Sequence, residues 1–478
     1  MQRILTVEQM RTADTHNIEK LGVSGEELVV RAGTAVADEI KKRFYGGRVL
    51  VCVGKGNNGA DGKVVADILS KTHGYSVMIH NIATGMLKVF DKKFDIIVDC
   101  IFGTGLNRAV EGKYKTTIEN INASGAYVIS CDIPSGINGN NGKVMGVAVK
   151  ANLTVAIQEY KLGHFLSDAP DYTGEIVLKD IGISVWDDEY VKKTDSTDAK
   201  HLFQHKNRNS HKGNFGKACI VGGSKKFSGS VILSASALCA LKSGAGYSNL
   251  AVPESLYLGY LPTVPECTKT PLKDIDGNII FDKRQLDELL KYDSIAIGMG
   301  MGVSRDVFDT ISYLIKNYSG NLLIDADGLN AIAKYGVGVL KNKKCKIVIT
   351  PHVGEFSRLT NFDKKLILDD PIKYVTEFSL EYGVTVLLKN AVSVITDGKE
   401  VYLNTTGCSG MAKGGSGDVL SGFICGLLAR SDDVLDCVLS GAYIFGKAGE
   451  RAQQKQNEFT MTATDIINEL PVIINEIL

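Results

Sequence analysis

A run of thirteen residues near the C-terminus combines glycines with a carboxylate just before an apolar stretch. The run is TGCSGMAKGGSGD, residues 406–418, and it continues into VLSGFICGLLA. Each glycine in an ordered segment costs roughly 0.5–1 kcal/mol relative to alanine, so five of them indicate a purpose other than folding. Their N–H groups, added to the partial positive charge at a helix N-terminus, would bind a phosphate. The run is not a Walker loop, because GxxxxGK[ST] is absent.

Asp418 stands in the first turn of the helix that this run predicts. An aspartate there is favoured electrostatically as a simple helix-start residue. The functional alternative is a base beside a bound phosphate, which takes the proton from a hydroxyl as it attacks the terminal phosphoryl group. GGSGD resembles the GAGD loop of ribokinase-like kinases, whose aspartate has this role.

A second glycine loop, GKGNNGADG at residues 54–62, follows the apolar run VLVCV and contains GxGxxG. Such a loop lets the backbone approach a phosphate at a helix start. No Asp or Glu stands at the end of YSVMIHNI, about 20 residues further on, where a dehydrogenase would bind a ribose hydroxyl. An ordinary dehydrogenase site is therefore disfavoured, and a glycine-rich turn without a ligand stays open as the alternative.

Polar residues also follow two further predicted strands. Asp99 ends FDIIVDC, and Asp132 ends AYVISCDIP ahead of Ser135. Because ligands collect at the carboxyl ends of parallel strands, Asn58, Asp99 and Ser135 could bring oxygen atoms together around a hard cation. Each acid alone could be a helix cap, but capping does not explain all of them together.

These residues must be positioned by two α/β domains. From Val49 onward, short β-branched runs alternate with amphipathic stretches, the pattern of βαβ units and a parallel sheet. The pattern lapses between about Ser184 and Lys200, where we expect a linker, and then restarts at GKACIVGG. The sequence therefore predicts domains over residues 1–190 and 201–478, the first a Rossmann-like αβα sandwich and the second a ribokinase-like α/β domain.

Composition excludes several classes of protein. With 478 residues, 44% of them hydrophobic, and a formal net charge of +0, the chain has the make-up of a globular protein without a global field for nucleic acid or an anionic membrane. No apolar run reaches the ~18 residues of a membrane span. The 10 cysteines form no CxxC pair, and those within VLVCV and CIVGG are expected to pack in the core. We expect a cytoplasmic homo-oligomer that binds a small molecule.

The run GKGNNGADG, with DCIFGTGL and CDIPSG, resembles the N-terminal domain of the bifunctional NAD(P)H-hydrate repair enzymes, the epimerase that interconverts R and S hydrates. The similarity spans about Thr6 to Ile183. It implies a potassium ion on Asn58, Asp99 and Ser135, and a substrate contact by Asp132. Because epimerisation breaks and remakes a bond on either face, it needs a positioned acid or base, and we expect Asp132 to be that group. The resemblance implies that the hydrated dinucleotide contacts Asn57, Asn58, Gly59, Ala60, Asp61, Gly103, Thr104, Gly105, Leu106, Asn107, Arg108 and Ala109.

From about His201 onward the chain resembles the dehydratase domain of the same enzymes, through LLIDADGLNAI, ITPHVGEFSRL, LLKNAVSVI and MAKGGSGDVLSG. The resemblance implies that Ser230, Gly302 and His352 touch the hydrate and that Asp418 faces it. Asp325 and Asp327 are either caps or help to organise magnesium and phosphate, and are not assigned to the site. The adenine nucleotide is expected on Lys389, Asn390, Ala391, Val392, Ser393, Cys408, Ser409, Gly410, Met411, Ala412, Lys413, Gly414, Gly415, Ser416 and Gly417.

The implied chemistry is a repair sequence. The S hydrate loses water after its hydroxyl is phosphorylated by ADP or ATP, because hydroxide itself leaves poorly, and Mg²⁺ neutralises charge on the phosphates. Two alternatives stay open: a ribokinase-like small-molecule kinase fused to a dinucleotide-binding domain, and a sensing protein that binds without turnover. The sequence chooses neither ADP over ATP nor NADH over NADPH.

Overall fold

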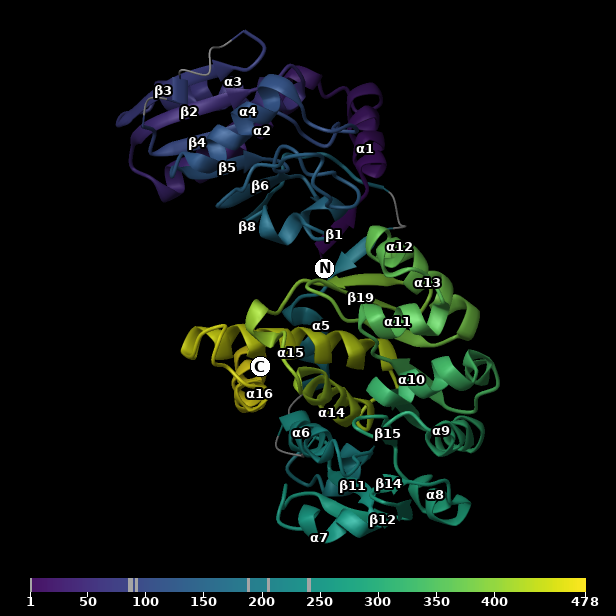
Figure 1. Ribbon diagram of the computed structural model, residues 1–478. Coiled ribbons are helices and arrows are strands. Elements are labelled where there is room, and N and C mark those ends of the chain that lie inside the picture. The colour runs from purple at the N-terminus through teal and green to yellow at the C-terminus, as the bar shows by residue number, and fades with distance from the viewer. Residues whose placement is uncertain (1, 85–88, 91–92, 187–189, 204–206, 239–241) are drawn as a thin grey trace. The chain divides into compact units, whose positions relative to one another are not determined.

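The computed structural model describes residues 2–84, 89–90, 93–186, 190–203, 207–238 and 242–478. The chain divides into two compact units, Gln2–Val191 and Lys192–Leu478 (Figure 1). Each unit has its own sheet and its own core. Among the described residues, no helix is both long and apolar enough to cross a bilayer.

The N-terminal unit contains a six-stranded parallel sheet in the order β3–β2–β4–β5–β6–β8. A separate parallel pair joins β1 to β7. The strands are β1 (Gln2–Leu5), β2 (Gly47–Val53), β3 (Tyr75–Asn81), β4 (Ile96–Cys100), β5 (Tyr127–Cys131), β6 (Leu153–Ile157), β7 (Tyr160–Lys161) and β8 (Glu175–Lys179).

Helices cover both faces of this sheet. Alternate β2 residues face opposite sides: Val49 and Val51 pack with α2 and α3, whereas Leu50 packs with α4. α1 begins with a capping box at Thr6, and Ser24 caps α2. The helices are α1 (Val7–Glu19), α2 (Gly25–Arg43), α3 (Asn57–Ser70) and α4 (Gly112–Ala123), with short 3₁₀ turns η2 (Leu162–His164) and η3 (Ala169–Asp171). The predicted αβα sandwich is confirmed.

The strand order places the loops after β2 and β4 next to each other at the carboxyl edge of the sheet. From β2 the chain steps outward to β3 and then returns to the other side of β2 with β4. The loops after β2 and β4 therefore diverge at a topological switch point, where open α/β sheets bind ligands.

The C-terminal unit has a mixed sheet in the order β12–β11–β10–β15–β16–β17–β18–β19–β20–β9. β12 to β18 run parallel, and β19 lies antiparallel between β18 and β20. The strands are β9 (Val191–Lys193), β10 (Lys217–Val221), β11 (Tyr247–Pro253), β12 (Thr268–Leu272), β15 (Ser294–Ile297), β16 (Asn321–Ile324), β17 (Lys346–Ile349), β18 (Thr385–Leu388), β19 (Ser393–Thr396) and β20 (Val401–Asn404), with a small hairpin of β13 (Asp274–Ile275) and β14 (Asn278–Ile279).

One group of helices in this unit, α5, α6 and α14 to α16, shares a hydrophobic core with β10 and β11. The predicted α/β class of this unit is confirmed. The helices are α5 (Ser196–Lys200), α6 (Ser228–Leu238), α7 (Tyr257–Tyr260), α8 (Lys283–Leu289), α9 (Arg305–Asn317), α10 (Ala326–Tyr335), α11 (Val353–Thr360), α12 (Lys364–Asp369), α13 (Pro371–Tyr382), α14 (Ser416–Leu428), α15 (Val434–Lys455) and α16 (Ala463–Ile477), with 3₁₀ turns η4 (His201–Phe203), η5 (Lys212–Phe215), η7 (Glu254–Leu256), η8 (Val337–Lys341) and η9 (Ser409–Met411).

The stretch expected to be a linker, Ser184–Lys200, contains the strand β9 and the helix α5. Residues 187–189 lie outside the described ranges, but Lys192 pairs with β20 and α5 packs through the fully buried Ala199. These elements were missed because strands and helices of three to five residues are too short to show a period. The core cysteines behave as expected, since Cys52 and Cys219 are fully buried.

Candidate active sites

The glycines of the N-terminal loop are required by backbone packing. A Cβ on Gly54 would lie 2.0 Å from the carbonyl oxygen of Ile101, and one on Gly59 would lie 2.2 Å from that of Gly54. The loops after β2 and β4 therefore touch through their backbones. α3 starts at Asn57 without a side-chain cap, so its first amides are left for a ligand.

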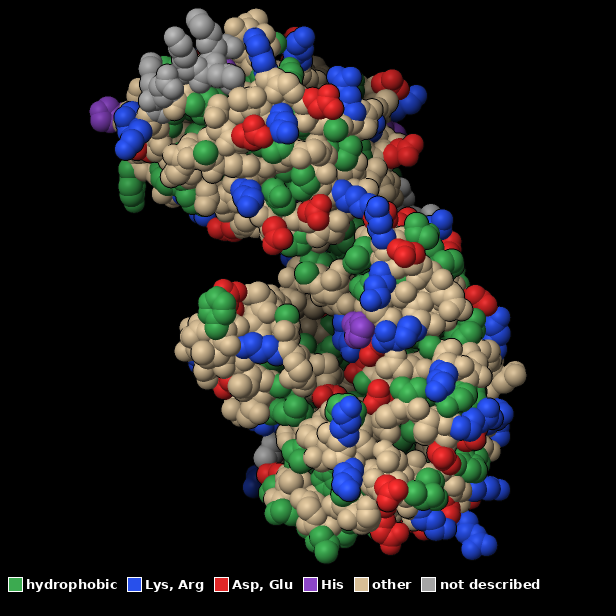
Figure 2. All heavy atoms as spheres, viewed as in Figure 1, with side chains coloured by type: hydrophobic (Ala, Val, Ile, Leu, Met, Phe, Trp, Pro, Cys, Tyr) green, Lys and Arg blue, Asp and Glu red, His purple; other side chains and the backbone are tan. Residues whose placement is uncertain are grey.

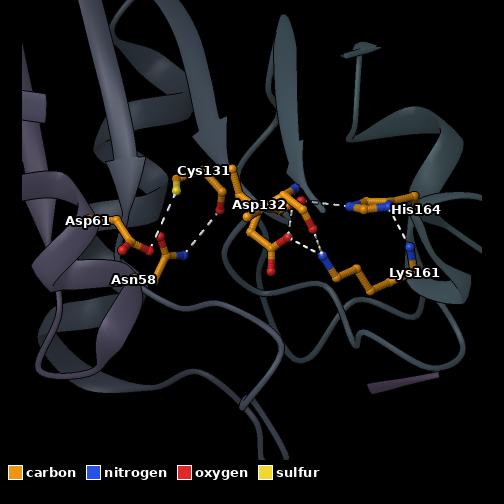
Figure 3. Close-up of polar contacts among 7 residues, drawn as sticks. Asn58, Asp61, Cys131, Asp132, Lys161 and His164 are labelled. Atoms are coloured by element: carbon orange, nitrogen blue, oxygen red, sulfur yellow. Dashed lines mark hydrogen bonds and ion pairs between the residues drawn. The ribbon is translucent and has the colours of Figure 1, made fainter. Parts of the chain in front are cut away.

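Asp99 is the centre of a buried polar cluster at the ends of β4 and β5. Its carboxylate accepts hydrogen bonds from Ser135 Oγ at 2.5 Å, Ser135 N at 2.8 Å and Ser130 Oγ at 2.8 Å. Burial raises the pKa of the Asp99 carboxyl above its ordinary value. Asn58 Nδ2 donates to Cys131 O at 3.2 Å, and Asn58 Oδ1 is buried without a hydrogen-bond partner (Figure 3).

A cavity of about 1000 Å³ opens beside this cluster at the switch point. Its wall includes Asp132 and most of the residues expected to contact the hydrated dinucleotide, whereas Gly59 and Ala60 do not contribute to it. Gly59 is instead packed against Gly54. The expected residues in the wall are Asn57, Asn58, Asp61, Gly103, Thr104, Gly105, Leu106, Asn107, Arg108 and Ala109.

Asp132 is held by a lysine that the sequence analysis missed. Lys161 is 1% exposed, and its Nζ lies 2.5 Å from Asp132 Oδ1 and 2.6 Å from Ile157 O. Figure 3 shows the Lys161 and Asp132 side chains pointing toward each other, with His164 against the Asp132 backbone. A lone lysine in EYKLGHF has no spacing that indicates a site, so only the fold could reveal it.

Two further carboxyls line the same cavity. Burial, with the charge of Asp132 added, raises the pKa of Asp61 to about 8. Burial raises the pKa of Asp14 to about 6, although Lys161 opposes the shift. Asp14 comes from α1, far from any motif, and was also missed. The cavity thus combines an ion-paired carboxylate, Asp132, with a carboxyl, Asp61, whose raised pKa keeps it protonated near neutral pH.

In the C-terminal unit, the glycine loop leads into α14 as predicted. α14 begins after Gly415, whose φ of 96° requires glycine, and it has no side-chain cap. Gly407 N and Gly410 N donate to Glu450 and Gln453 at 3.0 and 2.9 Å. Within the described chain, the amides of Gly414, Gly417 and Asp418 have no acceptor. The end of the loop nearest α14, rather than its whole length, is therefore open to an anion.

Asp418 faces a charged cluster. Burial, reinforced by Asp325, raises the pKa of Asp418 to about 6, while a hydrogen bond from Ser230 opposes the shift. Asp325 is 1% exposed, pairs with Lys389 Nζ at 2.8 Å and accepts from Ser421 Oγ at 2.7 Å. The sequence analysis left Asp325 unassigned, but the structure brings it together with Lys389 and Asp418.

His352 and Gly302 lie beyond the carboxyl ends of β17 and β15, the two strands that flank β16. His352 caps α11, accepting from Gly354 N at 2.9 Å, and its side chain is 54% exposed. Gly302 N donates to Asp327 Oδ2 at 2.8 Å. Both the capping role of His352 and a role in binding are therefore compatible with its position.

Of the predicted nucleotide residues 389–393, the first four form the turn between β18 and β19, and Ser393 begins β19. Burial opposes the charge of Lys389, but the carboxylates of Asp325 and Glu355 raise its pKa. Figure 2 shows the visible face of this unit hollowed between α16 and the helices α10 and α11, with side chains of both charges at its edge.

Comparison with known proteins adds family relationships to this geometry. Residues 218–472 match the family described as NAD(P)H-hydrate dehydratase, and residues 25–89 and 78–163 match the family described as YjeF-related protein N-terminus.

The chain is 32% identical to the bifunctional NAD(P)H-hydrate repair enzyme Nnr of Thermofilum pendens, over 98% of this chain and 95% of that protein. It is 30% identical to the enzyme of the same name from Dictyoglomus turgidum, over 100% and 99%. Among solved structures, an ADP/ATP-dependent NAD(P)H-hydrate dehydratase from Bacillus subtilis matches with a TM-score of 0.52 at 24% identity, covering 60% of this chain and 99% of that one. A ribokinase-like superfamily protein from Enterococcus faecalis matches with a TM-score of 0.51 at 21% identity, covering 62% and 98%.

Proposed function

The chain belongs to the bifunctional NAD(P)H-hydrate repair enzymes, and from that premise we propose that it interconverts the R and S hydrates of NADH and NADPH and dehydrates the S hydrate with ADP or ATP. We assign the epimerase to residues 1–190 and the dehydratase to residues 201–478. The observation that carries the proposal is the presence of two unrelated carboxylates, Asp132 and Asp418, each beside a loop with open helix N-terminal amides.

In the epimerase, Asp132 is the acid or base that acts at the hydrated carbon. Lys161 Nζ pairs with its carboxylate at 2.5 Å, and Asp132 borders the cavity. Asp61, whose pKa is raised to about 8, provides a protonated carboxyl in the same wall. A donor and an acceptor of protons are thus both within the cavity that would hold the nicotinamide ring.

Potassium is proposed on Asn58, Asp99 and Ser135. The buried, unbonded carbonyl oxygen Asn58 Oδ1 and the Asp99 carboxylate are the hard oxygen donors that such a cation prefers. We expect the wild-type protein to melt at a higher temperature in potassium chloride than in tetramethylammonium chloride. Asn58→Ala should remove that difference and the neighbouring Asn57→Ala should keep it; equal melting temperatures for the wild type would exclude the ion.

In the dehydratase, Asp418 takes the proton from the hydroxyl of the S hydrate as that oxygen attacks the terminal phosphoryl group. The amides of Gly414, Gly417 and Asp418 and the ammonium of Lys389 hold the phosphates. Asp327, with the nucleotide, would hold Mg²⁺, which neutralises phosphate charge when bound. Phosphate then leaves where hydroxide would not, the neighbouring ring carbon loses a proton, and the C=C bond of the reduced nicotinamide is restored.

One assay tests the whole proposal. Purified protein is given a mixture of R and S hydrates with ADP or with ATP, and the absorbance of reduced nicotinamide is followed. Return of all the cofactor, including that derived from the R hydrate, is the expected result. A kinase would consume nucleotide without restoring absorbance, and a binding protein would change neither.

A further inference from the structure

Asp132 has a backbone conformation that needs outside support. Its φ is 65°, in the left-handed region that non-glycine residues rarely occupy. Its N–H donates to Val155 O at 2.8 Å, and its carbonyl oxygen lies 2.6 Å from His164 Nε2. Strained residues of this kind persist only where their surroundings determine them, and His164 supplies one side of that support (Figure 3).

The hydrogen bonds of His164 define its tautomer. The backbone N–H of Lys161 donates to His164 Nδ1 at 3.0 Å, so Nδ1 is an acceptor. The proton of the neutral ring is therefore on Nε2, which donates it to the Asp132 carbonyl. Burial, together with the charge of Lys161, lowers the pKa of His164 to about 4, so the ring stays neutral.

The His164 ring is also held in place by aromatic packing. His164 is 1% exposed and lies edge-on to Tyr160 and Phe165, with ring centroids 6.3 and 6.0 Å apart. Next to it, a Cβ on Gly163 would lie 2.3 Å from Asn138 O, so the turn that presents the ring is tightly packed.

The support extends to one oxygen of the Asp132 carboxylate. Oδ1 accepts from Lys161 Nζ at 2.5 Å and from Ile157 N at 3.2 Å. Among the described residues, Oδ2 has no hydrogen-bond partner, and Asp132 borders the cavity. A bound substrate would therefore meet Oδ2.

We infer that His164 is a positioning residue for epimerisation, which, through its Nε2–H bond to the Asp132 carbonyl, holds that residue in the left-handed conformation and leaves Oδ2 free for the substrate. This inference rests on the proposed epimerase function. Lys161 fixes the other carboxylate oxygen, so the two side chains act on the backbone and the carboxylate respectively.

A matched pair of variants tests this role. In His164→Asn the side-chain oxygen can still accept from Lys161 N–H, but no donor reaches the Asp132 carbonyl. In His164→Gln the longer amide can reach that carbonyl with its NH₂. Because misplacing a catalytic group by about 1 Å costs about 100-fold in rate, we expect the epimerase kcat of His164→Asn to fall about 100-fold with KM unchanged, and His164→Gln to recover most of it.

Dehydratase activity of the same chains and their melting temperatures serve as controls for folding. Equal epimerase rates in the Asn and Gln variants, or a loss expressed only in KM, would overturn the inference.

A second measurement needs no substrate. The wild-type protein is labelled with ¹⁵N-histidine and studied by NMR, and the signal of His164 is identified among those of the eight histidines as the one that is absent from the Gln variant. A neutral ring protonated at Nε2 at pH 7 is expected, and a ring protonated at Nδ1 would contradict the inference. If the wild-type protein does not exchange the R and S hydrates, the proposed epimerase function is wrong, but the NMR result on the tautomer of His164 is still valid.

Discussion

At the scale of single residues, each proposed site depends on one carboxyl and on the charged groups around it. Asp132 is paired with a lysine, whereas Asp418 is buried near the carboxylate of Asp325 and has a pKa raised to about 6. A base must be ionised, so Asp418 as the proposed base should act only above that pKa. The rate of dehydration should therefore depend on pH near that value.

We predict that kcat/KM for dehydration falls about tenfold per pH unit below pH 6, because Asp418 becomes protonated. Ser230→Ala should move the midpoint to higher pH, since the hydrogen bond from Ser230 opposes the rise of the Asp418 pKa. pH–rate profiles of both proteins provide the check. If Ser230→Ala leaves the midpoint of the pH profile unchanged, Ser230 does not act on the Asp418 carboxyl.

The buried pair of Asp325 and Lys389 should matter for stability as well as for binding. Lys389→Met leaves a carboxylate that is 1% exposed without its cation. Removing one partner of a buried ion pair typically lowers the free energy of unfolding by about 3–5 kcal/mol. Because Ser421 still donates to Asp325, we expect a loss of about 3 kcal/mol, to be measured by denaturant unfolding. The control variant Lys341→Met removes an exposed pair with Glu381 and should lower the free energy of unfolding by less than about 1 kcal/mol.

At the scale of elements, the packing of α6 against α14 positions the dehydratase site. A Cβ on Gly422 would lie 2.0 Å from Ser234 O, and Ser234 Oγ in turn donates to Asp418 O at 2.9 Å. The same helix pair carries Ser230 and Asp418. Close approach of the two helices therefore decides whether those side chains meet.

Gly422→Ala should force α6 and α14 apart. We expect a loss of about 1–3 kcal/mol in the free energy of unfolding, as for other overpacked cores, together with slower dehydration and unchanged epimerisation. Gly229→Ala, on the exposed side of α6 with no atom within 4 Å of the new methyl group, is the matched control and should be neutral or slightly stabilising. Thermal unfolding and both activity assays decide between these outcomes.

At the scale of the whole molecule, the two proposed reactions belong to different units, each with its own sheet and core. Asp132 is in the N-terminal unit and Asp418 in the C-terminal unit. Each reaction should therefore survive loss of the other.

Asp132→Asn should stop R/S exchange while dehydration of the S hydrate continues, and Asp418→Asn should do the reverse. Each variant alone then leaves hydrate unrepaired, but an equal mixture of the two should repair the R and S hydrates completely, because free intermediates pass between molecules. Recovery of reduced nicotinamide is the measurement. Loss of both reactions in either folded variant would show that the sites are not independent.

Local chemistry alone was sufficient to predict the glycine loops, the acids at the strand ends and the α/β class, because the effects of glycine, aspartate and apolar periodicity act over a few residues. The catalytic roles of Asp132 and Asp418 stay predictions. Lys161, His164 and Asp14 could not be found in this way, since no motif contains them. Asp325 was noticed but stayed ambiguous, because its partner Lys389 is 64 residues away. The tertiary structure decided which of these side chains meet, because the strand order brings distant loops to one switch point. It also decided which carboxyls have a raised pKa, because burial is a property of the folded chain.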